Sequence, residues 1–443
     1  MPIRTLVLVL CAMCFVTRAS SAQEVLPPVP PAGERPVVPK TLTLDEALRL
    51  AEQHNPSLAA VRAGIRMAEG DRLTAARRPV PAVTFDSVGD YPFRQLSVDQ
   101  HEYVIRGDQE IETAGRRRLR LDVAQQGVTA ASASYEDARR RLRLDVRRAY
   151  LQARLAKADR EVAGTTLGEI DNLITLSRAR FQAGEISGTE PRRLQVERLR
   201  FVEDVFSADL AFRDASSALL ALMGSPDLAF EFDPVDPLAP ASGLLTPGLV
   251  MPMADLSSLQ RQALEGRPGI AVARSDEARA QTETRLQRAL RSPNITVGGG
   301  LSHLSGLNVA AFSVTVPLTF LNRNNNGPVV RADAEYEQAR QRTTATRTQV
   351  ALEVQQAMNA ARVSRARVEY LEREHLTTAR EARDIVLASY RLGEVDLTDY
   401  LDAQRAFRDT QRTYNRALYD ERLSLFSLDA AVGTPSTGTG EGR

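Results

Sequence analysis

Residues 180–190 read Arg-Phe-Gln-Ala-Gly-Glu-Ile-Ser-Gly-Thr-Glu, and residues 389–399 read Ser-Tyr-Arg-Leu-Gly-Glu-Val-Asp-Leu-Thr-Asp. The two stretches align at a single offset, so that a glycine, a glutamate and a threonine recur in the same order. The aligned pairs are Gly184 with Gly393, Glu185 with Glu394, Thr189 with Thr398, Gln195 with Gln404 and Gly224 with Gly433. A repeat of this length predicts that the chain consists of two copies of one unit.

Each stretch is predicted to be a turn between two long helices. Glycine tolerates the left-handed conformation that follows a helix C-terminus, so Gly184 and Gly393 are expected to end the first helix of each pair. A serine or aspartate with an acid three residues later has the spacing of a capping box, which predicts that the second helix begins almost at once. The pairs with this spacing are Ser187 with Glu190 and Asp396 with Asp399.

The helices on both sides of each turn are predicted to be very long. Residues 116–183 contain no proline, and at 1.5 Å per residue such a helix would extend about 100 Å. After the turn, apolar residues recur at alternating intervals of four and three, the pattern of a coiled-coil seam. They are Phe201, Val205, Ala208, Phe212, Ala215, Leu219 and Leu222. The second copy repeats both helices, from about 329 to 391 and from 398 to 431.

Before each long helix the period of the apolar residues changes from helical to alternating. Four strands of about ten residues are predicted, near 82–89, 102–112, 294–302 and 309–320. Such strands are typical of an outer-membrane barrel, although a soluble hairpin with one buried face fits the same alternation. Four strands cannot close a barrel, and lipid does not tolerate open strand edges, so a membrane location would require several chains to pool their strands.

The N-terminus has the features of a secretory signal peptide over residues 1–22. A basic start is followed by an apolar stretch at 6–16 and by small residues at 20–22, so the mature chain would begin near Gln23. The chain's two cysteines, Cys11 and Cys14, both lie in this peptide, which would leave the mature protein without a disulfide or a thiolate. Neither cysteine follows the small residue that a lipoprotein cleavage site needs, so a lipid anchor is not expected.

The rest of the chain divides around the two copies. We expect a proline-rich lead-in at 23–40, a first repeat at 41–224, a proline-rich linker crossing the surface at 225–255, a second repeat at 256–433 and a disordered tail at 434–443.

Composition argues against several classes of function. The chain has 57 basic and 56 acidic residues, so nothing indicates a nucleic-acid partner. Aromatic residues make up 5% of the chain and tryptophan is absent, which favours long helices over a compact enzyme core. No apolar run after the predicted signal is long enough for a membrane helix.

No catalytic, cofactor or metal site is expected from the motifs. The four histidines, His54, His101, His303 and His375, have no ligand spacing. The glycines at 298–300 lie in a predicted strand, where a bent or closely packed strand explains them better than a phosphate-binding loop does.

The chain resembles the TolC-like outer-membrane efflux proteins over most of its mature length. The carrying stretches are Leu-Thr-Leu-Asp-Glu-Ala-Leu at 42–48 with Asn-Pro-Ser-Leu at 55–58, Glu-Ile-Glu-Thr-Ala-Gly-Arg-Arg at 110–117, Leu-Leu-Ala-Leu-Met-Gly at 219–224, Val-Pro-Leu at 316–318, Asn-Arg-Asn at 322–324, and the two turns. Gly-Arg-Arg and Asn-Arg-Asn are most similar to the heavy-metal-efflux branch of that family.

The resemblance implies a mainly α-helical protein with β-strands that forms a homotrimer. Three chains would contribute twelve strands to a β-barrel in the outer membrane of a Gram-negative-type cell, and their long antiparallel coiled-coil hairpins would form a tunnel through the periplasm. The implied partners are a periplasmic adaptor (membrane fusion) protein and an inner-membrane pump. No enzymatic activity and no cofactor are implied.

The resemblance also assigns residues to the periplasmic entrance of the tunnel. In the family, acids line it six and nine positions after the second tip glycine, where this chain has Asp399 and Asp402. In a trimer they would form two rings of carboxylates, which favour cations and whose pKa values are raised by like-charge crowding. Alternatively, these acids only complement the dipole at the start of a helix.

The resemblance further implies a gate between the two tips. Tyr390 corresponds to a gate tyrosine that bonds an acid of the first tip, here Glu190. Val395 stands where the family has a basic residue, so the entrance is expected to be closed by fewer hydrogen bonds or by another arginine such as Arg193. The surface implied to meet the adaptor consists of Gly184, Glu185, Ile186, Thr189, Gly393, Glu394, Val395 and Thr398.

Two other functions remain open from the sequence. One is a type I secretion conduit of the same architecture that exports polypeptides, since the pump selects the cargo. The other is a periplasmic coiled-coil scaffold that does not enter the membrane. Metal ions, drugs and polypeptides all remain candidate substrates.

Overall fold

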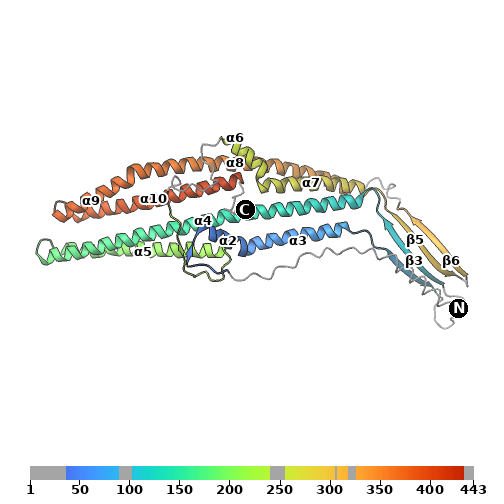
Figure 1. Ribbon diagram of the computed structural model, residues 1–443, viewed down its shortest axis with the longest axis horizontal. Coiled ribbons are helices and arrows are strands. Elements are labelled where there is room, and N and C mark those ends of the chain that lie inside the picture. Colours follow the sequence, from blue (N-terminus) through green and yellow to red (C-terminus); the bar gives the residue numbers. More distant parts are fainter. Residues whose placement is uncertain (1–35, 89–101, 240–254, 305–306, 318–325, 434–443) are drawn as a thin grey trace, which may run out of the picture. The chain divides into compact units, whose positions relative to one another are not determined.

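The computed structural model describes residues 36–88, 102–239, 255–304, 307–317 and 326–433 (Figure 1). The first copy contains β1 (Thr41–Leu42), α2 (Leu44–His54), α3 (Pro56–Ala76), β2 (Ala82–Val88), β3 (Glu102–Ile111), α4 (Arg116–Gln182) and α5 (Thr189–Leu222). After β4 (Asp233–Pro234), the second copy contains α6 (Leu256–Gly266), α7 (Pro268–Ala289), β5 (Ile295–Leu304), β6 (Leu307–Thr315), α8 (Gly327–Tyr370), the π-helical turn η4 (Leu371–His375), α9 (Leu376–Leu392) and α10 (Leu397–Val432). The predicted signal peptide, the predicted tail and His101 lie outside the described residues.

Local sequence signals set the first two helices. Thr43 and Glu46 form a capping box at the start of α2, in which the Thr43 amide donates to Glu46 Oε2 at 3.0 Å. This bond and the one from the Thr43 side chain lower the pKa of Glu46. Asn55 ends α2 and caps α3, because its Oδ1 accepts from the amide of Leu58 at 3.0 Å and Pro56 takes the first helical position.

Part of the predicted linker at 225–255 is packed against the first hairpin. Its residues Asp233–Pro234 form β4, which pairs in parallel with β1. The pair is held to α4 by Tyr150, whose hydroxyl donates to Leu42 O at 3.0 Å and accepts from the amide of Asp236 at 3.2 Å. Phe232 is 6% exposed. The proline content suggested a surface crossing, but the apolar residues between the prolines bury this part of the segment.

The four longer strands form one antiparallel sheet in the order β2-β3-β5-β6. The register places apolar side chains on one face: Val83, Phe85, Tyr103, Ile105, Ile111, Ile295, Val297, Leu301, Ala310, Phe312 and Val314. The charged side chains Asp86, Arg106, Asp108 and Glu110 lie on the other face. Apolar residues predominate on the first face because successive side chains alternate across a strand, although Gln109 and His303 also lie there and Val104 and Val309 lie on the other face.

The glycines at 298–300 bring β5 close to its neighbours. A Cβ on Gly300 would lie 2.4 Å from the carbonyl oxygen of Ile105, and one on Gly298 would lie 2.1 Å from Asp108 Oδ1. On the apolar face, the ring of Phe312 covers Gly299.

The prediction that the last strand reaches residue 320 is wrong, because β6 ends at Thr315. Val316 and Pro317 follow outside the strand, and proline has no amide to donate to a neighbouring strand. Residues 318–320 lie outside the described residues.

The two copies have equivalent hydrophobic cores. In the first, Ala47 and Ala51 of α2 pack with Leu142, Val146 and Tyr150 of α4. In the second, Leu259 and Ala263 of α6 pack with Val350, Val354 and Met358 of α8. Each short helix therefore covers the same stretch of the corresponding long helix.

The long helices of the two copies differ. α4 runs unbroken through 67 residues, as predicted. The helix predicted from about 329 to 391 is interrupted, because η4 separates α8 from α9. Among the described residues, no helix is both long enough and apolar enough to cross a membrane.

Candidate functional site at the hairpin tips

The two tip turns have the same backbone geometry. Gly184 and Gly393 are left-handed, with φ of 76° and 81°. The residue after each glycine donates its amide to a carbonyl five residues earlier: Glu185 to Arg180 O and Glu394 to Ser389 O, both at 2.9 Å. This is the Schellman arrangement, which satisfies the last carbonyls of a helix and needs a residue that tolerates positive φ.

The second tip begins its return helix as predicted, and the first does not. Asp396 and Asp399 form a capping box at the start of α10. At the first tip Gly188 is the N-cap, and the predicted pair of Ser187 and Glu190 is wrong. Ser187 Oγ lies 3.0 Å from Thr189 Oγ1 instead, and the Glu190 side chain has a partner in the other hairpin.

That partner is Tyr390. Its hydroxyl donates to Glu190 Oε1, so the structure brings together the two residues between which the family resemblance implies a gate. Tyr390 is 3% exposed. Burial and the bond to Glu190 both raise its pKa, because the phenolate would lose hydration and face a carboxylate.

The arginine at this contact is Arg180, not Arg193. Its guanidinium lies 5.9 Å from the centre of the Tyr390 ring, and its Nη1 donates to Tyr390 O at 3.4 Å. It also pairs with Glu185 at 3.2 Å, whereas Arg193 lies exposed on α5. Arg180 occurs four residues before Gly184 in the quoted stretch, but nothing in the sequence indicates that it reaches across to Tyr390.

A hydrophobic cluster behind the latch joins the hairpins. Tyr400 stacks on Tyr390 with ring centres 5.9 Å apart. Around them pack Ile170, Leu173, Ile174, Leu194, Phe201, Leu397 and Leu401. Burial, with a smaller contribution from the negative charge of Glu169, raises the pKa of Tyr400 to about 12.

Polar side chains continue this joint along α10. The amide of Gln404, which is 1% exposed, donates to Glu169 Oε2 at 2.6 Å, and Arg383 donates to Glu169 Oε1 at 3.0 Å. Arg405 pairs with Glu197 at 2.6 Å. Glutamine recurs at 195 and 404 in the sequence, but this repeat alone does not predict the bond to Glu169.

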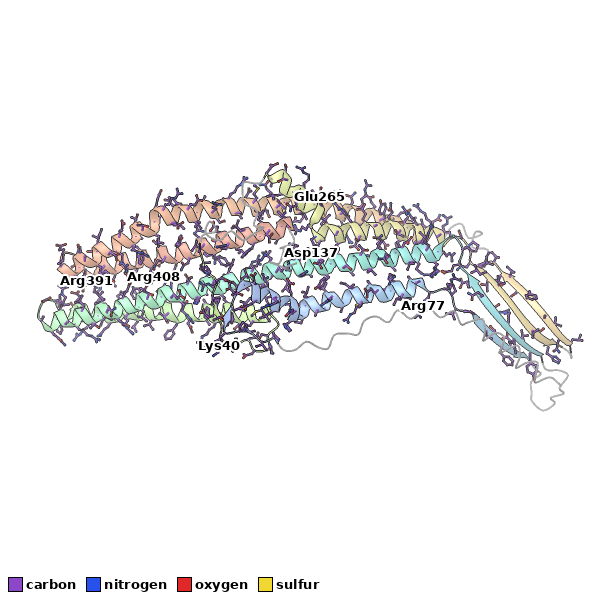
Figure 2. All side chains as sticks on the ribbon, viewed as in Figure 1. Lys40, Arg77, Asp137, Glu265, Arg391 and Arg408 are labelled. Atoms are coloured by element: carbon purple, nitrogen blue, oxygen red, sulfur yellow. The ribbon has the colours of Figure 1, made fainter. Side chains whose placement is uncertain are left out.

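Arg408 extends the same joint to α5. This arginine, labelled in Figure 2, pairs with Asp204, and its guanidinium lies 5.7 Å from the centre of the Phe201 ring. Together with Arg405, it ties the return helix of one hairpin to the return helix of the other.

The two acids predicted to line the entrance are both exposed, but they have different contacts. Asp399 Oδ2 accepts from the amide of Asp396 at 3.3 Å, so it acts as a helix-capping acid in the single chain. Asp402 pairs with Arg405 at 2.9 Å, and its side chain is 65% exposed.

The surface predicted to meet an adaptor lies at the ends of the hairpins. Gly184, Glu185, Thr189, Gly393, Glu394 and Thr398 are exposed, and Ile186 and Val395 are half-buried. Among the described residues, no group of three or more histidine, cysteine, aspartate or glutamate side chains is arranged to hold a metal ion.

Comparison with known proteins gives consistent results over both repeats. The family model described as Outer membrane efflux protein matches residues 47–225 and 259–434. Cobalt-zinc-cadmium resistance protein CzcC of Cupriavidus metallidurans is 24% identical over 404 residues, which cover 90% of this chain and 92% of that protein. Pyoverdine export outer membrane protein OpmQ of Pseudomonas aeruginosa is 22% identical over 88% of this chain and 83% of its own length.

The fold is shared with solved structures. A crystal structure of CusC, described in terms of folding and transmembrane channel formation, superposes with a TM-score of 0.75 at 19% identity, covering 88% of this chain and 92% of that one.

Proposed function

The chain belongs to the outer membrane efflux protein family and is the outer-membrane channel component of an efflux system, and on this premise we propose how its tips control the channel. Members of the family are channel proteins, not enzymes, and work as trimers with adaptors and inner-membrane pumps. We propose that residues 1–22 direct export, and that three chains then pool their sheets into a barrel and their hairpins into a tunnel.

In this proposal the Tyr390–Glu190 bond is the latch of the tunnel. It is the observation that carries the proposal, because the bond joins the second hairpin to the first at their free ends. The cluster around Tyr400 and the Arg405–Glu197 pair support the closed arrangement from behind. Opening would break the bond while each hairpin keeps its own turn.

Asp399 and Asp402 would form the acidic entrance. Both carboxylates lie in the first two turns of α10 and are exposed in the single chain, so three copies would place six of them around the axis. Neutralising both with Asp399→Asn and Asp402→Asn should reduce cation selectivity in lipid bilayers, since rings of carboxylates favour cations. Unchanged selectivity would reject this role.

The exposed turn residues would be the docking surface for the adaptor. They include two glycines and two glutamates at equivalent positions, Gly184 with Glu185 and Gly393 with Glu394, which would offer an adaptor two similar contact points per chain. Replacing both glutamates by arginine should lower adaptor binding without changing the trimer, and normal binding would remove these turns from the interface.

We propose heavy-metal cations as the cargo of the whole system. The relative CzcC is named for cobalt, zinc and cadmium resistance and aligns over nine-tenths of this chain. A deletion strain should become sensitive to these cations and recover when the gene is restored. Sensitivity to siderophores or drugs alone would reassign the cargo.

The conduit itself is tested by its location and assembly. The mature protein should appear in the outer-membrane fraction as a detergent-stable trimer that dissociates on heating. A soluble monomer in the periplasm would contradict the proposal and favour a scaffold.

A further inference from the structure

The sequence offset between equivalent positions of the two copies changes by one residue along the first long helix of each hairpin. Midway along the hairpins, where α2 and α6 pack, the equivalent buried positions are 208 residues apart: Leu142 and Val350, Val146 and Val354, Tyr150 and Met358, Ala153 and Ala361. At the tips the offset is 209, as for Gly184 and Gly393. The return helices keep 209 throughout, with Gln195 and Gln404 near the tip and Leu219 and Leu428 near the far end. The second copy therefore has one additional residue between positions 361 and 393.

The additional residue is accommodated in η4. A turn closed by an i→i+5 hydrogen bond contains one residue more than an α-helical turn, and the amide of Leu376 donates to Leu371 O, five residues back. A side-chain contact supports the same wider turn, because the rings of Tyr370 and His375 meet edge to face with centres 4.7 Å apart. Residues five apart on an α-helix point about 140° away from each other, so this contact fits the wider turn.

No residue of η4 is buried, although Leu371 packs partly against the cluster on its sheet side. On the sheet side, Val368 packs with Ala417 and Leu418, and on the tip side the cluster around Tyr390 and Tyr400 closes the hairpins together. Between these clusters lies a cavity of about 520 Å³ among α4, α9 and α10. Its walls include Glu161, Thr166, Arg380, Arg383, Phe407 and Asn415.

We infer that η4 is a hinge, about which the tip of the second hairpin turns relative to the first. π-turns are recognised sites of helix bending, and α4 has no such interruption in its 67 residues. Tyr390, Asp399 and Asp402 all lie beyond η4 and move with it. Only the role of the hinge depends on the proposed function. That role is to let the Tyr390–Glu190 latch open while α4 stays straight.

The one-residue excess is tested by deletion. Removing Arg373, which is exposed, should convert η4 into an ordinary α-helical turn and leave every residue beyond it in place. The variant should assemble with wild-type yield. The matched control removes Thr165, the exposed residue 208 positions earlier, in a helix without a π-turn. That deletion rotates the rest of α4 by about 100° and should reduce assembly at least tenfold. Equal losses from the two deletions would contradict the assignment.

The hinge is tested by distances between the tips. Cysteines introduced at the exposed positions Arg192 and Arg391 would be spin-labelled in trimers diluted with unlabelled chain. With Tyr390→Phe to release the latch, the width of the distance distribution should at least double. Adding the Arg373 deletion should return it to near the wild-type width. Equal widths with and without the deletion would overturn the hinge.

Hydrogen exchange tests the hinge in the unaltered protein, so the result cannot be affected by misfolding of a variant. Amides at 371–376 should exchange at least tenfold faster than those at 162–168 of α4, and equal rates would count against the hinge. These measurements need neither pump nor cargo. A protein that passes them but does not conduct would refute the conduit and leave the hinge standing.

Discussion

Tyr390 is held at the tip by its buried ring and by a hydrogen bond, and the two contributions can be separated. Tyr390→Phe keeps the stacking on Tyr400 and removes only the bond to Glu190. Since Glu190 is half-buried and regains water, the loss of stability should be modest, about 1 kcal/mol. Conductance in planar bilayers should rise, because the two hairpins are no longer latched.

The control for this change is Glu190→Gln, which keeps an acceptor for the Tyr390 hydroxyl but removes the charge. It should give a smaller rise in conductance than Tyr390→Phe. If Tyr390→Phe leaves conductance at the wild-type level, the bond is structural and the gate lies elsewhere.

Tyr400 predicts a loss of stability in alkali. Its pKa is raised from 10.0 to about 12, mainly by burial. Below pH 10 both the folded and the unfolded chain keep the proton, so stability is unaffected. Between pH 10 and about 12 the unfolded chain releases a proton that the folded chain retains, so the free energy of unfolding falls as pH rises.

The measurement is the pH dependence of unfolding, compared between wild type and Tyr400→Phe. The variant should lose less stability over this interval, and phenolate absorbance should show one fewer late-titrating tyrosine. Parallel curves for the two proteins would show that Tyr400 ionises freely in the folded state.

Residues whose partners are close in sequence were the easiest to predict. Asp396 and Asp399 form the expected capping box because both partners lie in one turn. The same spacing failed for Ser187 and Glu190, because Glu190 bonds a residue in the other copy. The Arg180 contact with Tyr390 was not predicted for the same reason: a tertiary contact leaves no local pattern in either segment.

At the scale of the elements, the three adjacent glycines of β5 differ in the space that a Cβ would find at each position. Gly300→Ala would place a Cβ 2.4 Å from the backbone oxygen of Ile105, which cannot move without disturbing β3. Gly299→Ala would meet the Phe312 ring at 3.4 Å and the carbonyl oxygen of Ala311 at 3.9 Å, both ordinary contacts. Gly300→Ala should therefore cost about 1–3 kcal/mol of stability, and Gly299→Ala should be nearly neutral.

The heat-dissociation midpoint of the trimer measures this difference, with the two alanine variants as each other's control. Equal midpoints would mean that the strands are spaced differently in the assembled protein.

Long elements were predictable because their periods persist. The 4-3 seam of α5 and the alternation of β3 and β5 each extend over several repeats, so tertiary contacts do not override them. Three elements, β1, β4 and η4, were not predicted, for two different reasons. β1 and β4 have two residues each, too few for a period. The one-residue excess at η4 leaves apolar spacing intact on both sides and becomes visible only when the two copies are compared position by position.

At the scale of the whole molecule, the sheet predicts the need for other copies. Its two faces differ in polarity. It also has two outer strands, β2 and β6, each paired on only one side within the described residues. Its apolar face is strongly exposed, with Phe312 at 91% and Val314 at 69%. A single chain in lipid would leave strand edges unsatisfied, which favours closure with further copies.

Two neighbouring residues of β6 separate the lipid-facing role from the interior one. Val314 lies on the apolar face, and Ser313 lies on the opposite face beside Gly298, near the carboxylate of Asp108. Val314→Arg should cost about 2–4 kcal/mol if it lies near the middle of the bilayer, and it should abolish the outer-membrane trimer. Ser313→Arg introduces the same side chain facing water and a carboxylate, so it should assemble normally.

Equal assembly of both variants would mean that the apolar face does not contact lipid. A failure of Ser313→Arg alone would mean that the two faces are reversed, with Asp86 and Asp108 outside. Since the register fixes both faces together, either result would change the assignment of every strand at once.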